Sequence, residues 1–219
     1  PRRGGRGREQ PGTARRQTHV TASKTLNMPE KTGLFFGSFN PVHIGHLIIA
    51  NYMATQTELR QVWFVVSPHN PLKAKQSLAR DHDRLHLVRL AIGDNPRLRA
   101  SDIEFKLPQP SYTIDTLAHL KEKYPDRNFA LIMGSDNLAT LHKWKNYELI
   151  LRDYELYVYR RPDTPPTELE QHPNVHCFDA PMMHLSATYI RDCIRAGKSV
   201  QYLVPEPVFE YLESSGLYR

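Results

Sequence analysis

Short apolar runs alternate with helical patterns along most of the 219-residue chain. Four of these runs have the length and content of buried strands, and they lie at residues 34–36, 61–66, 128–133 and 154–159. Segments with apolar residues at helical spacing separate them. Strands that alternate with helices in this way predict a parallel sheet with helices on both faces.

The segment after Asp81 illustrates the helical pattern. We interpret Asp81 as an N-cap, with Leu85 and Val88 on the buried face and Arg84 and Arg89 flanking it. The strand and helix patterns together predict a Rossmann-like, doubly wound α/β fold. We expect a mostly parallel sheet with helices on both faces and a small C-terminal helical part.

Size and cysteine content narrow the class of protein. No internal repeat or second break in composition is visible, so we expect one folded domain at residues 28–219. No run of 18 apolar residues is present, and no transmembrane helix is expected. Cys177 and Cys193 show no metal-ligand spacing, and we expect a reduced, cytoplasmic setting.

The net charge of +6 belongs to one end of the chain. Residues 1–27 hold seven basic residues and one acidic residue, whereas the other 192 residues hold 22 of each. We expect the tail at 1–27 to be disordered, because it has almost no large apolar residues. It is interpreted as an arm for RNA or a membrane surface, as a targeting segment, or as sequence foreign to the folded protein. Met28 resembles a natural start and favours the last interpretation.

The chemistry concentrates in the stretch at 37–46, which reads as a strand end, a tight loop and a helix start. Gly37 allows close approach of a ligand to the backbone, and His43 and His46 share a face on a first helical turn. Free backbone N–H groups and two imidazoles form a natural phosphate site. The alternative is an ordinary turn with two surface histidines.

Polar clusters follow the predicted strands at 37–46, 67–73, 134–136 and 160–161. In an open parallel sheet, ligands bind outside the carboxyl ends of the strands. The sequence therefore predicts one site along that edge of the sheet.

The stretch at 37–46 resembles the signature of the H-x-G-H nucleotidyltransferase superfamily. Asn40 stands where Asp is usual, and Phe36 stands where a first Gly often precedes. The resemblance implies that His43 and His46 are catalytic and contact the α-phosphate of ATP. It also implies an ATP site that includes Gly37, Ser38, Phe39 and Gly45.

A second element at 185–191 resembles the superfamily's triphosphate-binding segment. Ser186 and Thr188 lie at a helix start, with Arg191 one turn on, so hydroxyls, N–H groups and a guanidinium converge on an anion. The alternative is a Ser N-cap followed by an amphipathic helix. The resemblance assigns all three residues to the ATP triphosphate.

The segments 111–113, 134–136, 160–162 and 216–219, together with Trp144, resemble the bacterial nicotinate-nucleotide adenylyltransferases. The resemblance implies that Asp136 contacts the ATP ribose or a metal ion. It places in the nicotinate-nucleotide site Lys73, Tyr112, Thr113, Trp144 and Arg161. The usual histidine just before Lys73 is absent, which leaves the role of His69 open.

These resemblances imply adenylyl transfer from ATP to nicotinate mononucleotide, with Mg²⁺ held mainly by the ATP phosphates and no dedicated protein metal site. Other acceptors stay open, namely nicotinamide mononucleotide, phosphopantetheine or a choline-like phosphate. A nucleotide binder without activity and an RNA-binding module with a basic arm are further alternatives. The balanced charge of residues 28–219 argues against nucleic acid or membrane binding by the folded part.

Overall fold

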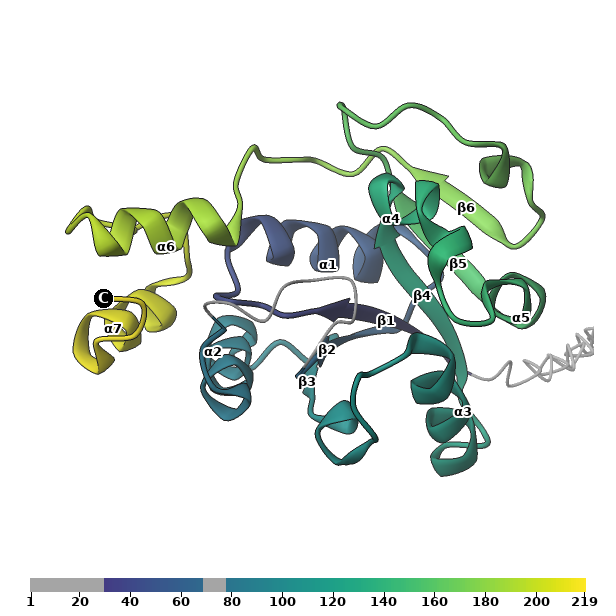
Figure 1. Cartoon of the computed structure of the whole chain (residues 1–219), viewed down its shortest axis with the longest axis horizontal. Helices are drawn as coiled ribbons and strands as arrows, with labels where there is room; N and C mark the ends of the chain where they lie inside the picture. The colour runs from purple at the N-terminus through teal and green to yellow at the C-terminus, as the bar shows by residue number, and fades with distance from the viewer. Residues whose placement is uncertain (1–29, 69–77) are drawn as a thin grey trace, which may run out of the picture.

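The computed structural model describes residues 30–68 and 78–219. The predicted tail at 1–27 and the residues His69 and Lys73 lie outside this range. The described residues form a six-stranded sheet in the order β3-β2-β1-β4-β5-β6, in which all neighbouring strands run parallel (Figure 1). The prediction of a doubly wound α/β fold is therefore confirmed.

The strands are β1 Lys31–Gly37, β2 Gln61–Val66, β3 Leu98–Ser101, β4 Asn128–Gly134, β5 Glu155–Tyr159 and β6 Val175–Phe178. The α-helices are α1 Ile44–Gln56, α2 Asp81–Ile92, α3 Thr113–Lys123, α4 Ser135–Ala139, α5 Tyr147–Asp153, α6 Ala187–Arg195 and α7 Glu206–Ser215. Three 3₁₀ turns complete the order: η1 Ile103–Lys106, η2 Leu141–Lys143 and η3 Glu168–Gln171.

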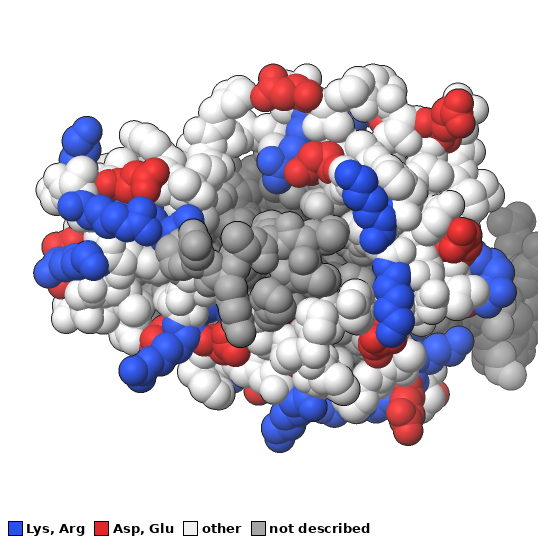
Figure 2. Space-filling view, in the orientation of Figure 1, with Lys and Arg blue, Asp and Glu red and all other residues white. Residues whose placement is uncertain are grey.

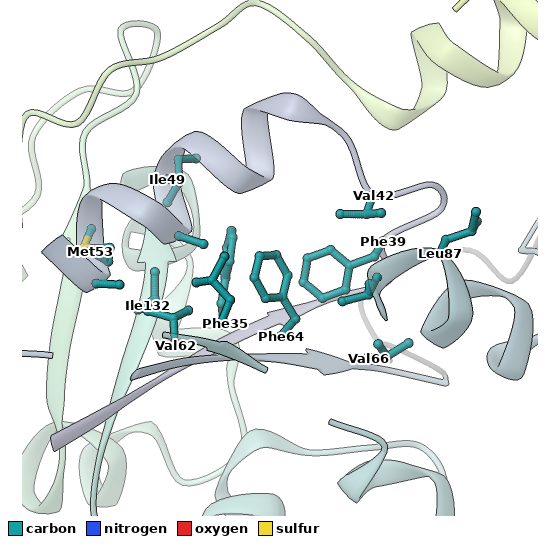
Figure 3. Packing of buried hydrophobic residues seen from close by; sticks show 14 of the residues in the cluster. Phe35, Phe39, Val42, Ile49, Met53, Val62, Phe64, Val66, Leu87 and Ile132 are labelled. Carbon is teal, nitrogen blue, oxygen red and sulfur yellow. The ribbon is translucent and has the colours of Figure 1, made fainter. Parts of the chain in front are cut away.

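Both faces of the sheet are covered, because successive residues of each buried strand point to opposite sides. Phe35 and Phe64 lie under α1 and form one buried cluster with its Ile49 and Met53 (Figure 3). On the other face, Leu34 belongs to a second core with residues of α3, α4 and α5. Burial on both sides explains why the strand sequences are apolar throughout.

The order of the strands reverses between β1 and β4. The chain runs from β1 outward to β2 and β3, and then returns to pair β4 with the free side of β1, with Phe35 opposite Ile132. A crevice forms at such a switch point, beyond the carboxyl ends of the strands. Helices α6 and α7 lie at the end of the sheet where α1 begins (Figure 1).

The structure corrects the interpretation of α2. Its N-cap is Arg80 and its first residue is Asp81. Arg84, predicted to flank the buried face, is 0 % exposed. Its guanidinium donates to the carbonyl oxygens of Ala79 and two loop residues and pairs with Asp81 at 2.7 Å. A buried guanidinium is tolerated here because its N–H groups find acceptors.

The surface carries charges of both signs. Figure 2 shows Lys and Arg interspersed with Asp and Glu around the visible face, without a broad basic patch. Exposed ion pairs join several of them, such as Lys145 with Asp115 at 2.8 Å. Within residues 30–68 and 78–219, no helix is long and apolar enough to cross a membrane.

Candidate active site

The loop between β1 and α1 is held from inside by Phe39. This residue adopts a left-handed backbone with φ of 44°, an uncommon conformation for a bulky residue. Its ring is buried and lies 5.1 Å from the His46 ring and 5.2 Å from the Phe64 ring, centroid to centroid. A Cβ on Gly37 would meet that ring at 2.8 Å, so only glycine fits there. Phe39, predicted to contact ATP, thus places its side chain in the core against His46.

The rings of the two histidines lie against each other at the start of α1, with their planes inclined by 30°. His43 is the N-cap of the helix, and its backbone N–H donates to Nδ1 of His46 at 3.2 Å. Nδ1 of His46 is therefore an acceptor, and in the neutral ring the proton sits on Nε2. The ring centroids lie 3.7 Å apart. A Cβ on Gly45 would come within 3.1 Å of the His43 ring, which explains the glycine between them.

His43 is held neutral by its surroundings. Its side chain is only 6 % exposed, and burial together with the nearby Arg161 guanidinium lowers its pKa to about 4. Desolvation and a like charge both disfavour the imidazolium form. His43 therefore offers hydrogen bonds, not a fixed positive charge, to a ligand at neutral pH.

The start of α6 faces the two histidines. Ser186 caps this helix by accepting the N–H of Tyr189 at 3.1 Å. Arg191 donates to the Thr188 hydroxyl at 3.2 Å and to the backbone oxygen of Asn40 at 2.8 Å. The second of these bonds ties α6 to the loop before α1, so the two predicted ATP segments do come together.

These segments line a cavity of about 440 Å³, here called the donor cavity. The predicted ATP residues along its wall are Gly37, Ser38, Phe39, His43, Gly45, His46, Ser186, Thr188 and Arg191. Asp136 is not among the lining residues of this cavity. Its carboxylate pairs with Arg161 at 3.0 Å.

A second cavity of about 630 Å³, here called the acceptor cavity, opens beside the first. Tyr112, Thr113 and Trp144 line it, as predicted for one ligand site. Lys145 lies over the Tyr112 ring at 4.9 Å, which adds a cation to the rim. Arg161, predicted for this site, instead lines the donor cavity. The predicted contact Lys73 lies outside the described residues.

The two cavities share a wall at the carboxyl ends of the central strands. The residues common to both are Phe35, Phe36, Gly37, Ser67, Asn137 and Tyr159. A molecule that fills one cavity therefore meets a molecule in the other along the end of β1. This is the switch point at which the fold is expected to bind its ligands.

Four buried polar atoms among the described residues have no hydrogen-bond partner: His43 Nδ1, Arg191 Nε, Glu104 Oε2 and Trp144 Nε1. All four residues line one of the two cavities, the first two the donor cavity and the last two the acceptor cavity. Leaving such atoms unpaired is costly, and native proteins rarely do so without a reason. Ligand atoms that enter both cavities would supply the partners.

Glu104 is a site residue that the sequence interpretation missed. It is 1 % exposed, and Oε1 accepts the Thr116 hydroxyl at 2.7 Å. Burial raises the pKa of its carboxyl group, against the hydrogen bonds from neighbouring hydroxyls. An acidic residue between Ile103 and Phe105, just before the turn at 111–113, was the available signal.

The described residues that line the donor cavity include no Asp or Glu. Among residues 30–68 and 78–219, no group of three or more His, Cys, Asp or Glu side chains is placed to hold a metal ion. Asp136 does not line the cavity, but its carboxylate pairs with Arg161, which does. A divalent ion bound here would take most of its ligands from a bound nucleotide and from water.

Comparison with known proteins places the chain among nucleotidyltransferases. The family model described as cytidylyltransferase-like matches residues 34–193. A probable nicotinate-nucleotide adenylyltransferase of Flavobacterium johnsoniae is 54% identical over 191 residues, which cover 86% of this chain and 99% of that protein. A relative of the same name from Porphyromonas gingivalis is 42% identical over 192 residues, which cover 85% of this chain and 95% of that protein.

Solved structures share the fold at low sequence identity. The nicotinic acid mononucleotide adenylyltransferase of Plasmodium falciparum, complexed with NaAD, aligns with a TM-score of 0.74 at 18% identity over 86% of this chain and 97% of its own. A putative nicotinate-nucleotide adenylyltransferase of Vibrio parahaemolyticus aligns with a TM-score of 0.65 at 21% identity over 87% and 96%. These structures therefore share the overall α/β fold of this chain.

Proposed function

Since the chain belongs to the nicotinate-nucleotide adenylyltransferases of the cytidylyltransferase-like family, we propose that it transfers the adenylyl group of ATP to nicotinate mononucleotide in NAD biosynthesis. The products are nicotinate adenine dinucleotide and pyrophosphate. The observation that carries the proposal is the set of four unpaired polar atoms, which is divided evenly between two cavities with a common wall. Two cavities that meet at one wall suit a reaction that joins two nucleotides.

The donor cavity suits the triphosphate of ATP. The groups that line it are the imidazoles of His43 and His46, the first of them held neutral by its lowered pKa, together with hydroxyl groups, the backbone at two helix starts and the guanidinium of Arg191. Nε2–H of His46 and a ring nitrogen of His43 would hydrogen-bond the α-phosphate. Thr188 and Arg191 would hold the β,γ end, which leaves as pyrophosphate. Ser38 and the backbone at Gly37 would border the phosphates.

The acceptor cavity suits a flat, charged ring with a ribose phosphate. Trp144 would stack on the nicotinate ring, and Thr113 would contact its carboxylate or the nearby phosphate at the start of α3. Tyr112, with Lys145 over its ring, would border the same ligand. The acceptor's phosphate would then point toward the shared wall and the α-phosphate of ATP.

In the reaction, a phosphate oxygen of the acceptor attacks the α-phosphorus of ATP. The bond from that phosphorus to the bridging oxygen of the β-phosphate breaks, and its electrons leave with pyrophosphate. No covalent enzyme intermediate is required. Catalysis rests on positioning and on donors aimed at the charge that develops in the transition state. Arg161 lines the donor cavity and would add positive charge there, whereas its partner Asp136 would meet a ribose hydroxyl or a metal ion.

The family uses ATP and generally requires a divalent metal ion, and we propose Mg²⁺ in this role. Asp136 would be its protein ligand, alongside phosphate oxygens and water. When bound, the ion neutralises negative charge on the triphosphate. We place the enzyme in the cytoplasm, because its cysteines, Cys177 and Cys193, are both free. We propose that residues 28–219 form a single nucleotidyltransferase domain.

The decisive experiment supplies ATP with one acceptor at a time and measures pyrophosphate release and the dinucleotide product. Nicotinate mononucleotide should be adenylylated faster than nicotinamide mononucleotide, whose amide replaces the carboxylate. Phosphopantetheine should be inert. Turnover of phosphopantetheine, with nicotinate mononucleotide inert, would refute the proposed acceptor. If nicotinamide mononucleotide were preferred, the proposed reaction would stand and the proposed acceptor would be wrong.

A further inference from the structure

Asn40, in the loop before α1, joins three distant parts of the chain. Its side-chain oxygen accepts the backbone N–H of Ala79 at 3.0 Å and the hydroxyl of Tyr218 at 2.8 Å. Its backbone oxygen accepts Nη1 of Arg191 at 2.8 Å. Asn40 is only 3 % exposed, so these bonds lie beneath the surface of the donor cavity that Asn40 lines.

Tyr218 reaches Asn40 through a turn that holds it in an uncommon conformation. After α7 the chain turns at Gly216, with φ of 69°, and Tyr218 itself has a positive φ of 69°. A tyrosine adopts this backbone conformation only where surrounding contacts hold it. The hydroxyl lies near the guanidinium groups of Arg84 and Arg191. Burial nevertheless raises its pKa, which keeps it protonated and able to donate.

We propose that Tyr218 is a positioning residue of the adenylyl transfer, acting through Asn40 on Arg191 and on the loop that leads to His43. The inference rests on the proposed function. Both oxygen atoms of Asn40 are in use, one for Tyr218 and Ala79 and the other for Arg191. A change at the side chain is therefore transmitted to the carbonyl that orients the guanidinium.

Arg191 is the residue through which Asn40 would act on the bound ligand. Nη1 and Nη2 are occupied by Asn40 and Thr188, and Nε is buried without a partner at the donor cavity. The direction of that unpaired N–H depends on the two bonds that fix the plane of the guanidinium. Loosening of Asn40 would turn the plane and misalign the N–H group for phosphate. This misalignment should weaken the use of ATP and leave the binding of nicotinate mononucleotide in the acceptor cavity unchanged.

The test replaces Tyr218 by Phe, which removes only the hydroxyl. In steady-state assays of the full chain with ATP and nicotinate mononucleotide, Tyr218→Phe should lower kcat/KM for ATP by about 3- to 10-fold, the range expected for one hydrogen bond. The KM for nicotinate mononucleotide should stay within about twofold. Tyr211→Phe is the matched control, because Tyr211 lies on α7 against the His86 ring at 4.7 Å and touches neither cavity.

A double-mutant cycle with Asn40→Ala tests the route. Once the side-chain oxygen of Asn40 is gone, Tyr218→Phe should have little further effect on kcat/KM for ATP. Thermal unfolding of each variant sets the assay temperature well below its Tm, so that loss of folded protein does not enter the rates.

Three results would overturn the inference. Unchanged kcat/KM for ATP in Tyr218→Phe would show that the hydroxyl positions nothing. Equal losses for both substrates, or an equal loss in Tyr211→Phe, would show a general structural effect. An undiminished loss in the Asn40→Ala background would show a route that bypasses Asn40. Failure of the unsubstituted enzyme to adenylylate nicotinate mononucleotide would instead refute the proposed function.

Discussion

The donor and acceptor cavities share a wall but are built in different ways. The predicted ATP residues that line the donor cavity lie in two continuous sequence segments, the loop at 37–46 and the start of α6, which a hydrogen bond from Arg191 to Asn40 joins directly. The acceptor cavity takes its lining mainly from short segments of separate elements, at 111–113, 131–133 and 143–145, together with Glu104.

The unpaired atoms in the two cavities also differ in kind. In the donor cavity both are nitrogen atoms, on His43 and Arg191. In the acceptor cavity, one is a carboxyl oxygen of Glu104 and the other is the N–H of Trp144. A set of nitrogen atoms suits one chemical group, a phosphate, whereas a mixed set suits a ligand with several kinds of polar group. We therefore propose that the donor cavity serves the reaction and the acceptor cavity the choice of substrate.

The largest effect that would test this division is expected for His46→Ala. Removal of the Nε2–H donor should reduce turnover by about 10²-fold or more, by analogy with other donors that stabilise transition-state charge. Steady-state kcat with saturating ATP and nicotinate mononucleotide measures it. Circular dichroism should show an intact fold, and the affinity for nicotinate mononucleotide should be retained. Near-normal turnover would remove His46 from the catalytic role.

The pH dependence of stability should have opposite signs in the two cavities. The pKa of His43 is lowered to about 4, so the unfolded chain binds the proton first and acid destabilises the fold. Between pH 7 and 5 the titration of His43 should lower the free energy of unfolding by about 2 kcal/mol. His43→Asn should remove this loss of stability. The pKa of Glu104 is raised, so the folded state binds the proton first and stability is gained as the pH falls.

Urea unfolding of the wild type, His43→Asn and Glu104→Gln at a series of pH values measures both contributions. Relative to the wild type, His43→Asn should lose less stability on acidification. Glu104→Gln should lose more, because its gain from protonation is gone. If both variants followed the wild-type curve, the two side chains would be open to solvent, and the contrast between buried groups would fail.

A smaller effect is expected for Trp144, confined to the acceptor. Trp144→Ala should raise the KM for nicotinate mononucleotide about 10-fold, from lost stacking and lost apolar contact, and leave the KM for ATP within about twofold. Trp144→Phe keeps an aromatic ring, so its KM for nicotinate mononucleotide should fall between those of the wild type and Trp144→Ala. Equal changes in both KM values would mean that the cavities do not act separately.

Much of the fold follows from local sequence. The strand at 61–66 was predicted to the residue, because a buried parallel strand is an uninterrupted apolar run between polar residues. Strand β6 was missed, since its four residues include His176 and Cys177 and lie at the edge of the sheet. Arg84 was misplaced because a charged side chain on a helix normally faces solvent, and only distant carbonyl groups make its burial acceptable.

The residues of the donor cavity were largely predictable from the sequence, whereas the long-range contacts that hold them in place were not. His43, His46 and Arg191 lie in segments whose residue order resembles a known signature, and the structure brings them to one cavity. The bond between Tyr218 and Asn40 spans 178 positions, and no local pattern encodes such a contact. Which cavity Arg161 lines depends on the packing of β5 beside β4, which its sequence neighbours do not reveal.

The shared wall has a consequence for inhibitor design. Fragments that occupy the two cavities would be separated by the shared wall, to which Gly37 at the end of β1 and Tyr159 at the end of β5 both belong. A short linker would make the second binding event intramolecular, at an effective concentration in the millimolar range for short flexible linkers. Two weak fragments joined across Gly37 would therefore gain avidity without any new contact with the protein.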